Sequence, residues 1–196
     1  VTGAAGGLGA AVAEHLAARG AALALTDVPS SRLGEVLHDV SDAVMIPADL
    51  RADAHRLPAL AAEALGGLDG VVNAAGIMQT VPFAALEPAD WERIISVNLT
   101  ATFRLVQAAG AVMTTGAIVS IASVAARSGR PDAAHYAASK SAVLSLTKSA
   151  ASALAPRVRV NAVCPGVIMT PMWERIIQDR DSEFGEGAGE AYFAQV

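Results

Sequence analysis

Tyr136 and Lys140 are the two side chains of this sequence best suited to move a proton together. They stand four residues apart at the start of a run with helical character, so a helix places both on one face. A phenol ordinarily has a pKa of about 10, and an ammonium group beside it lowers that pKa by favouring the phenolate. The pair is therefore a candidate general acid–base system. The alternative is that both side chains share a solvent-exposed face by coincidence.

Ser123 is a third candidate for the same chemistry. It follows an apolar run over residues 117–122 and precedes Tyr136 by 13 residues. The run predicts a strand, and open parallel sheets bind ligands at the carboxyl ends of their strands. We therefore expect Ser123 to donate a hydrogen bond to the substrate oxygen with which Tyr136 exchanges its proton. Taken alone, Ser123 could equally cap a helix or a loop.

A glycine-rich stretch at the beginning of the sequence is typical of a dinucleotide site. Residues 2–9 read TGAAGGLG, and an Ala-rich amphipathic run follows over residues 10–19. Glycines permit a tight turn and the close approach of a pyrophosphate, whose charge the N-terminus of the next helix attracts. Asp27 ends the next apolar run, 18 residues after Gly9. In folds that bind a dinucleotide at such a glycine-rich turn, a carboxylate about 20 residues further on accepts a ribose hydroxyl. The alternative is an ordinary loop between a strand and a helix.

Alternating patterns along the chain predict the elements that must position these residues. Apolar runs that predict strands cover residues 22–26, 43–48, 68–72, 117–122 and 158–163. Helical patterns cover residues 10–19, 30–40, 54–65, 87–113 and 134–155. This alternation predicts an α/β fold, a doubly wound parallel sheet in a three-layer αβα arrangement. A chain of 196 residues with this pattern is expected to form a single domain, with the strand at 43–48 buried.

The two ends of the sequence carry further expectations. If Val1 and Thr2 end a first, central strand, most of that strand precedes residue 1, so we expect a longer polypeptide with C-terminal elements as well. The segment 166–196 has no clear period and is expected to be a mobile substrate flap. The side chains of that segment expected to line the pocket are Met169, Met172, Trp173, Tyr192 and Phe193.

Composition narrows the classes of function. Hydrophobic residues make up 53% of the chain and charged residues 17%, which is typical of a compact domain. The formal net charge of −5 does not favour nucleic acid or an anionic membrane surface. No apolar run is long enough to predict a membrane span, and no metal site is predicted. The single Cys164 excludes an intramolecular disulfide and fits a reducing compartment, so we expect a cytoplasmic protein.

Together these motifs resemble those of the short-chain dehydrogenase/reductase family. The resemblance covers nearly the whole chain in the family's order and is carried by Thr2-Gly3-x-x-x-Gly7-x-Gly9, Asn73-Ala74-Ala75-Gly76, Asn98, Ser123, Tyr136-x-x-x-Lys140 and Pro165-Gly166. One departure is the turn after Asn73, in which the family often has a second Asn. The resemblance implies a Rossmann fold and an oxidoreductase that transfers a hydride between NAD(H) and a secondary alcohol or ketone.

The resemblance also implies a role for each motif residue. Tyr136 is the general acid–base, and Lys140 lowers its pKa and holds the nicotinamide ribose. Ser123 orients the substrate oxygen. Asn98 holds a water that connects Lys140 to solvent, or alternatively satisfies helix backbone, and Asp49 meets the adenine or alternatively caps a turn. The implied NAD-binding residues are Gly3, Gly6, Gly7, Leu8, Gly9, Asp27, Val28, Asp49, Leu50, Asn73, Ala74, Ala75, Gly76, Tyr136, Lys140, Pro165, Gly166, Ile168 and Thr170.

The choice of cofactor and substrate can be narrowed further. Asp27 favours NAD over NADP, because its carboxylate accepts ribose hydroxyls and repels a 2′-phosphate, and neither Gly6 nor Val28 is basic. The stretch 171–174 looks like that of members acting on small polyols or hydroxy-ketones. A 3-oxoacyl-thioester or steroid-type ketoreductase remains an alternative, as does a non-catalytic dinucleotide-binding scaffold.

Two helical runs also predict self-association. From residue 137 to 155, 11 of 19 residues are apolar and lie on more than one helical face, and the run 99–113 is similar. One face can cover the sheet, and the other then needs a partner. Family members commonly pair these two helices, so we expect a homo-oligomer, a tetramer, that acts on a small-molecule alcohol or ketone.

Overall fold

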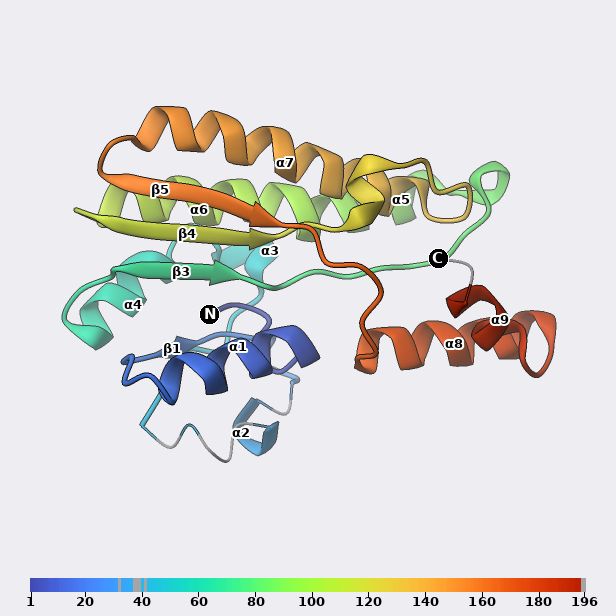
Figure 1. Ribbon diagram of the computed structural model, residues 1–196, viewed down its shortest axis with the longest axis horizontal. Helices are drawn as coiled ribbons and strands as arrows, with labels where there is room; N and C mark the ends of the chain where they lie inside the picture. Colours follow the sequence, from blue (N-terminus) through green and yellow to red (C-terminus); the bar gives the residue numbers. More distant parts are fainter. Residues whose placement is uncertain (32, 37–39, 41, 195–196) are drawn as a thin grey trace.

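The computed structural model describes residues 1–31, 33–36, 40 and 42–194. Within these ranges, parallel strands alternate with helices (Figure 1). The strands are β1 (Ala24–Leu25), β2 (Val44–Met45), β3 (Gly70–Asn73), β4 (Gly116–Ile121) and β5 (Val158–Val163). β1 pairs with β2, while β4 lies between β3 and β5. The predicted α/β fold with a parallel sheet is confirmed.

Thr2 joins the two groups of strands. It forms isolated parallel bridges with Thr26, next to β1, and with Asn73, the last residue of β3. The Thr2 amide donates to the Val72 carbonyl at 3.0 Å, and the Ala74 amide donates to the Thr2 carbonyl at 3.2 Å. The order across the molecule is therefore β2, β1, Thr2, β3, β4, β5. Thr2 occupies the central position that the sequence predicts for the end of a first strand.

The helices follow the predicted alternation. They are α1 (Gly7–Ala17), α2 (Leu33–Val36), α3 (Leu50–Asp53), α4 (Leu57–Leu65), α5 (Pro88–Ile95), α6 (Ala101–Val112), α7 (Ala134–Leu154), α8 (Pro171–Phe184) and α9 (Ala188–Phe193). Short 3-10 turns are η1 (Phe83–Ala85) and η3 (Val124–Arg127). A π-helical turn, η2 (Ser96–Thr100), links α5 directly to α6. In the described ranges, no helix combines the length and the apolar character needed to cross a membrane.

Two hydrophobic cores hold the layers together. The larger core packs α4 and α6 against β3, β4 and β5, and its members include Leu57, Val71, Leu105, Ile118 and Val160. The smaller core packs α1 against β1, with Ala10, Ala13, Leu23 and Leu25 among its members. Burying a Leu, Ile or Val side chain stabilises a fold by roughly 1.5–3 kcal/mol. The two cores lie on opposite sides of the strands, as the three-layer arrangement requires.

Some element bounds differ from the sequence predictions. The strand expected over 43–48 shrinks to β2, whose Val44 and Met45 are 36% and 45% exposed rather than buried. Among the described strands β2 pairs only with β1, so it lies at the margin of the sheet. The helix expected from residue 54 begins at Leu57, because Pro58 is tolerated only in a first turn. Of the helix expected over 30–40, α2 is described, and residues 32 and 37–39 lie outside the described ranges.

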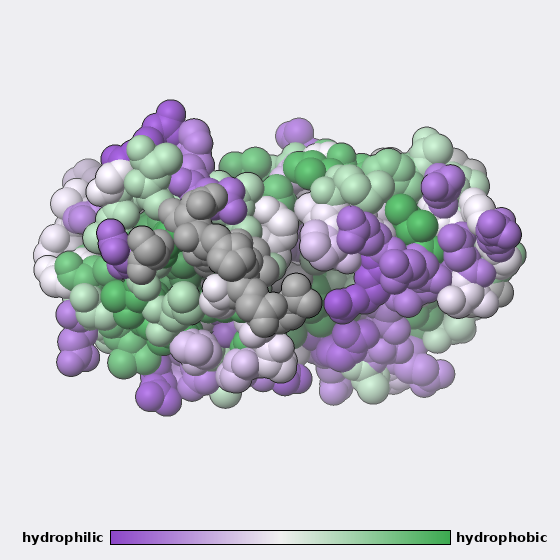
Figure 2. Space-filling view, turned by 90° about the horizontal axis from the view of Figure 1, so that it is seen from below, coloured by the Kyte–Doolittle hydropathy of each residue, from purple (hydrophilic) through white to green (hydrophobic). Residues whose placement is uncertain are grey.

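The segment after β5 contains two helices, whereas its sequence shows no clear period. Pro171 starts α8 at a position that suits proline, and α9 folds back on α8. The Gly189 amide donates to the Asp181 carboxylate at 2.8 Å, and a Cβ at Gly189 would overlap the backbone of Ile177. Figure 2 shows that hydrophilic side chains gather over the half of the molecule that carries these helices. The many charges of the exposed face of α8 hide its periodicity in the sequence.

Candidate active site

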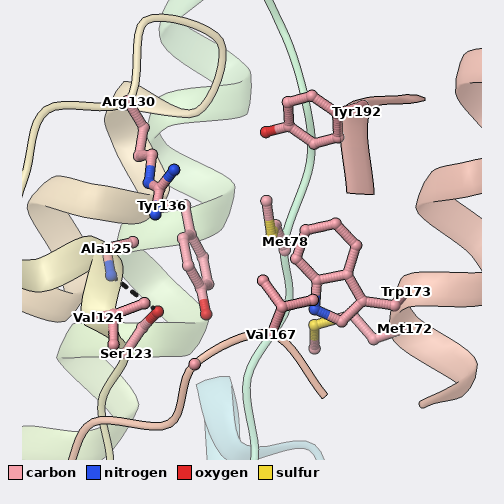
Figure 3. Close-up of a pocket in the computed structure, with 11 residues that line it drawn as sticks. Met78, Ser123, Val124, Ala125, Arg130, Tyr136, Val167, Met172, Trp173 and Tyr192 are labelled. Atoms are coloured by element: carbon pink, nitrogen blue, oxygen red, sulfur yellow. Dashed lines mark hydrogen bonds between the residues drawn. The ribbon is translucent and has the colours of Figure 1, made fainter. Parts of the chain in front are cut away.

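Ser123 and Tyr136 line one pocket, and their hydroxyl groups point into the same part of it (Figure 3). Ser123 follows β4 and precedes η3, while Tyr136 lies in the first turn of α7. The Ser123 hydroxyl accepts a hydrogen bond from the Ala125 amide at 3.1 Å and keeps its own proton to donate. Ser123 therefore caps η3 and also occupies the position expected for catalysis.

Lys140 lies next to Tyr136 on the same side of α7. Its side chain is buried, and its Nζ is 5.8 Å from the centre of the Tyr136 ring. Nζ donates a hydrogen bond to the Ile121 carbonyl at 2.8 Å, and burial lowers the pKa of Lys140 to about 8. A Cβ at Gly76 would lie 3.2 Å from Nζ, so glycine leaves the space that the ammonium group occupies.

The pKa of Tyr136 moves in the direction opposite to the sequence prediction. Burial raises the pKa of the phenol, and the neighbouring Ser123 hydroxyl opposes that rise. The physical reason is that Lys140 donates to a backbone carbonyl instead of the phenol, so its charge does not outweigh the loss of water. By itself the chain favours the protonated phenol, the form that a general acid requires.

Asn98 lies in η2 and connects three parts of the site. Its Oδ1 accepts a hydrogen bond from the Ile77 amide at 2.9 Å, and its Nδ2 donates to the Ile77 carbonyl at 2.9 Å. Nδ2 also donates to Ser139 Oγ at 3.1 Å, which donates to the Tyr136 carbonyl at 2.7 Å. Asn98 thus satisfies backbone groups, as its alternative role predicts. These groups belong to the segment after β3, however, and not to a helix. Ser139 and Ile77 were not predicted, because only the fold brings them to Asn98.

The glycine-rich turn is closed by its own backbone and by the segment before α8. Gly3 has a φ of 65°, which other residues rarely adopt. A Cβ at Gly9 would overlap the Gly3 carbonyl oxygen, so only glycine fits at position 9. A Cβ at Gly7 would come within 2.9 Å of Thr170 Cγ2. This contact places Thr170 beside the turn, as expected if both meet one ligand.

The N-terminus of α1 offers backbone donors to an anion. Gly6 is the N-cap, and no side chain caps the helix. Among the hydrogen bonds of the described residues, none starts from the amides of Gly7, Leu8 or Gly9. Uncapped amides and the positive end of the helix dipole attract phosphate. This turn therefore fits the pyrophosphate of a dinucleotide.

Asp27 lies beside this turn at the end of β1. Its Oδ2 accepts a hydrogen bond from the Ala5 amide at 2.8 Å, and its Oδ1 accepts one from the Val28 amide at 2.8 Å. The two bonds fix the direction of the carboxylate, and each oxygen retains a lone pair. The carboxylate therefore fits the ribose hydroxyls predicted for it.

Two of the predicted binding residues use their side chains within the protein. Asn73 accepts a hydrogen bond from the Thr2 hydroxyl at 2.6 Å and donates to the Thr102 hydroxyl at 2.8 Å. Asn73 thus ties the centre of the sheet to α6. Asp49 caps α3 and pairs with Arg51 at 2.6 Å, and its hydrogen bond with Arg51 lowers the pKa of the Asp49 carboxyl. The capping alternative for Asp49 is therefore present.

The other predicted residues fall in different places. Gly166 lines the pocket, and the neighbouring Pro165 carbonyl accepts the Val124 amide at 3.0 Å. Ile168 is 43% exposed, whereas Leu50 belongs to the larger core. The structure thus brings Gly166 to the catalytic pair and leaves Leu50 a packing role.

The pocket confirms much of the predicted lining and adds to it. Its walls are Met78, Ser123, Val124, Ala125, Arg130, Tyr136, Gly166, Val167, Met172, Trp173 and Tyr192. Met172, Trp173 and Tyr192 confirm the expectation, while Met169 is not in the lining and Phe193 packs edge-on against Trp173 with ring centres 5.5 Å apart. In the described part of the chain, no group of three His, Cys, Asp or Glu side chains is placed to hold a metal ion.

Comparisons with known proteins show the family to which the chain belongs. The family model described as short chain dehydrogenase matches residues 1–181. L-2,3-butanediol dehydrogenase of Corynebacterium glutamicum is 37% identical over 205 residues, which cover 98% of this chain and 80% of that protein.

Two solved structures extend the likeness to the fold. A short-chain dehydrogenase/reductase described as glucose/ribitol dehydrogenase, from Brucella melitensis, is 42% identical with a TM-score of 0.82, covering 93% of this chain and 77% of that one. An actinorhodin polyketide ketoreductase with NADPH is 30% identical with a TM-score of 0.87, covering 97% and 78% of the two chains. The family model and these relatives show that the chain belongs to the short-chain dehydrogenase family of oxidoreductases.

Proposed function

We propose that the protein is an NAD-dependent dehydrogenase that interconverts a small secondary alcohol and its ketone. The observation that carries this proposal is the meeting of the Ser123 and Tyr136 hydroxyls in one pocket, with Lys140 beside the phenol. A scaffold that only binds a dinucleotide needs no such set. When bound, the dinucleotide would supply the hydride donor or acceptor, and its oxidised nicotinamide would carry a positive charge that favours a phenolate.

The side chains of the pocket manage one proton. In ketone reduction Ser123 donates a hydrogen bond to the carbonyl oxygen, and Tyr136 gives its proton to that oxygen as negative charge develops there. The raised pKa of Tyr136 keeps the phenol protonated before the reaction. Lys140, with a pKa of about 8, is mostly charged at neutral pH and stabilises the phenolate that forms. In alcohol oxidation the same groups act in the reverse order.

The residues around α1 support NAD as the cofactor. The amides of Gly7, Leu8 and Gly9 would hold the pyrophosphate, and Asp27 would accept the ribose hydroxyls. A 2′-phosphate would meet the negative charge of Asp27 without a basic residue at Gly6 or Val28 to offset it. We therefore expect kcat/KM with NAD(H) to exceed that with NADP(H), measured on one substrate. A ratio near one, or in favour of NADP(H), would contradict this assignment.

The relatives and the pocket support a small substrate with a second polar substituent, such as a polyol or a hydroxy-ketone. Butanediol and ribitol, named for two similar proteins, have this character. Trp173 and Tyr192 restrict the pocket opposite Tyr136 (Figure 3). A 3-oxoacyl-thioester ketoreductase is the second candidate, favoured by the likeness to a polyketide ketoreductase and by the apolar Met78 and Val167.

A substrate panel followed by NADH absorbance tests this proposal. The panel contains acetoin, 2,3-butanediol, ribitol and acetoacetyl-coenzyme A, with a steroid ketone as the bulky member. The proposal expects the highest kcat/KM for one of the small compounds. A clear preference for the thioester would favour the second candidate, and tight NADH binding without turnover of any member would favour the scaffold.

We also propose that the protein is a homotetramer in a reducing, cytoplasmic compartment. Trp91 on α5 and Phe103 on α6 are large apolar side chains that are 41% and 44% exposed, which supports a partner that covers these helices. The single Cys164 supports the compartment. Light scattering at micromolar concentration should give the mass of an oligomer, and the mass of a monomer would refute the first part.

A further inference from the structure

Of the described residues that line the pocket, Arg130 is the one with a charged side chain. It lies on the loop between η3 and α7, and its side chain extends toward Tyr136 (Figure 3). Among the described residues its guanidinium group forms no hydrogen bond and no ion pair, although an arginine has five N–H groups to donate. A half-buried arginine with no acceptor next to a catalytic phenol suggests that a ligand supplies the acceptor.

The nearest acidic residue along the chain, Asp132, is already engaged elsewhere. The Asp132 carboxylate pairs with Arg180 of α8 at 3.2 Å. Burial raises the pKa of Tyr192, and the nearby Asp132 carboxylate adds to that rise. The Arg180 guanidinium stacks over the Tyr192 ring with its carbon 3.9 Å from the ring centre. Asp132 is thus paired with Arg180, and Arg130 has no ion-pair partner of its own among the described residues.

The loop that carries Arg130 is held by its backbone. The Val81 amide donates to the Asp132 carbonyl at 2.7 Å, and the Phe83 amide donates to the Pro131 carbonyl at 2.8 Å. The Ala133 amide donates to the Arg130 carbonyl at 3.2 Å. A side chain on a loop fixed in this way needs little ordering to bind a ligand, so most of its interaction energy remains available for affinity.

The chemistry of the rest of the pocket defines the ligand group that Arg130 would receive. Most of the other walls are apolar, with Met78, Val124, Val167 and Met172 among them. A charge in partly apolar surroundings is stabilised by an opposite charge, and a guanidinium group pairs with a carboxylate through two parallel hydrogen bonds. A phosphate carries about two negative charges at neutral pH, more than one arginine balances.

We propose that Arg130 binds a carboxylate of the substrate, so that the protein acts on small oxo acids and the matching hydroxy acids. This inference rests on the proposed function and specifies its second polar substituent. The carboxylate pairs with Arg130 at one end of the pocket while the carbonyl oxygen meets Ser123 and Tyr136 at the other. The reaction itself is unchanged: a hydride and a proton reduce the ketone to the alcohol, and the carboxylate takes no part in bond making.

The kinetic test compares 3-oxobutanoate with its methyl ester, which has the same carbon skeleton without the charge. Arg130→Gln should lower kcat/KM for the acid by about 10- to 100-fold, because a hydrogen bond to a charged group is worth roughly that factor. The same substitution should change kcat/KM for the ester by less than about twofold. Arg130→Lys should restore part of the loss. The matched control is Arg127→Gln, which removes an equal charge from an exposed position in η3 and should affect neither compound.

A binding test separates this inference from the proposed function. Trp173 lines the pocket, and the only other tryptophan, Trp91, can be removed as Trp91→Phe, so fluorescence reports on the pocket. Titration with 3-oxobutanoate at saturating NAD⁺, which cannot reduce a ketone, measures binding without turnover. Binding that Arg130→Gln abolishes, with no turnover of any ketone, would refute the proposed function, and with it the oxo-acid substrate, and would sustain the assignment of carboxylate binding to Arg130. Turnover in which the acid and the ester respond equally to Arg130→Gln would overturn the inference and leave the function standing.

Discussion

Lys140→Met should change how the stability of the protein depends on pH. Lys140 is buried within the fold, and burial lowers its pKa from 10.5 to about 8. The folded state therefore holds the lysine proton less tightly than the unfolded chain does. Methionine fills a similar volume but does not titrate, so the variant removes this difference and little else that depends on pH.

The direction and the size of this pH dependence follow from the linkage between proton binding and folding. Between pH 8 and pH 10.5 the unfolded chain binds more protons than the folded one, so wild-type stability rises with pH in this window and is lowest below pH 8. At about 1.4 kcal/mol for each tenfold change in proton affinity, the full effect is about 3 kcal/mol, of which about 2 kcal/mol falls between pH 7 and pH 9.5. The lost hydrogen bond from Lys140 to the Ile121 carbonyl shifts the variant by a constant amount, which cancels in the pH dependence.

Urea unfolding of the dinucleotide-free protein at several pH values measures this difference. At fixed protein concentration, the difference in unfolding free energy, wild type minus Lys140→Met, should rise by about 2 kcal/mol between pH 7 and pH 9.5. Tyr136 is present in both proteins, so its own titration does not contribute to the comparison. Parallel stability profiles for the two proteins would refute the lowered pKa that burial gives to Lys140.

Two further predictions concern folding. His135 is fully buried in α7 without a hydrogen-bond partner among the described residues, and burial lowers its pKa while Asp90 and Arg93 act in opposite directions, so wild-type stability should fall as pH drops below about 6.5. Urea unfolding should show that His135→Leu reduces this loss of stability at low pH, whereas the control His15→Gln, at an exposed position, leaves it unchanged. If the unfolding free energy of His135→Leu depends on pH as strongly as that of the wild type, His135 is not a buried neutral imidazole. Gly9→Ala should abolish NADH binding or folding, because its Cβ overlaps the Gly3 carbonyl, whereas Gly70→Ala meets no atom within 4 Å and should bind NADH normally. NADH fluorescence and circular dichroism check this pair, and normal binding by Gly9→Ala would show that the turn is not packed as described.

The parts of the site that depend on local spacing could be predicted from the sequence. The separation of Tyr136 and Lys140 fixes their common face once a helix is assumed, and α7 begins and ends within one residue of the predicted range. Ser123 could be predicted because it comes just after an apolar run that forms a strand, and parallel sheets bind ligands at the carboxyl ends of their strands. β5 has the predicted bounds, since its apolar residues alternate along a short run between clear turn signals.

The parts that depend on distant contacts could not be predicted in this way. Arg130 and Met78 are separated by 52 residues and were not predicted, yet both line the pocket that contains Tyr136. No periodicity links such positions, because the loops that carry them follow no repeat. The direction of the Tyr136 pKa was also missed, since it depends on how deeply the phenol is buried and on where Lys140 directs its hydrogen bond.

The central claim is that Tyr136 transfers the proton, and Tyr136→Phe tests it most directly. The variant keeps the ring and its packing but removes the hydroxyl group. Loss of a general acid–base typically lowers a rate by about 10²- to 10⁴-fold, so kcat on the best substrate of the panel should fall by at least that range. The dissociation constant of NADH, measured by fluorescence, should change little, because the turn before α1 and Asp27 hold most of the dinucleotide. Wild-type turnover by Tyr136→Phe would contradict the account and assign the proton to another group.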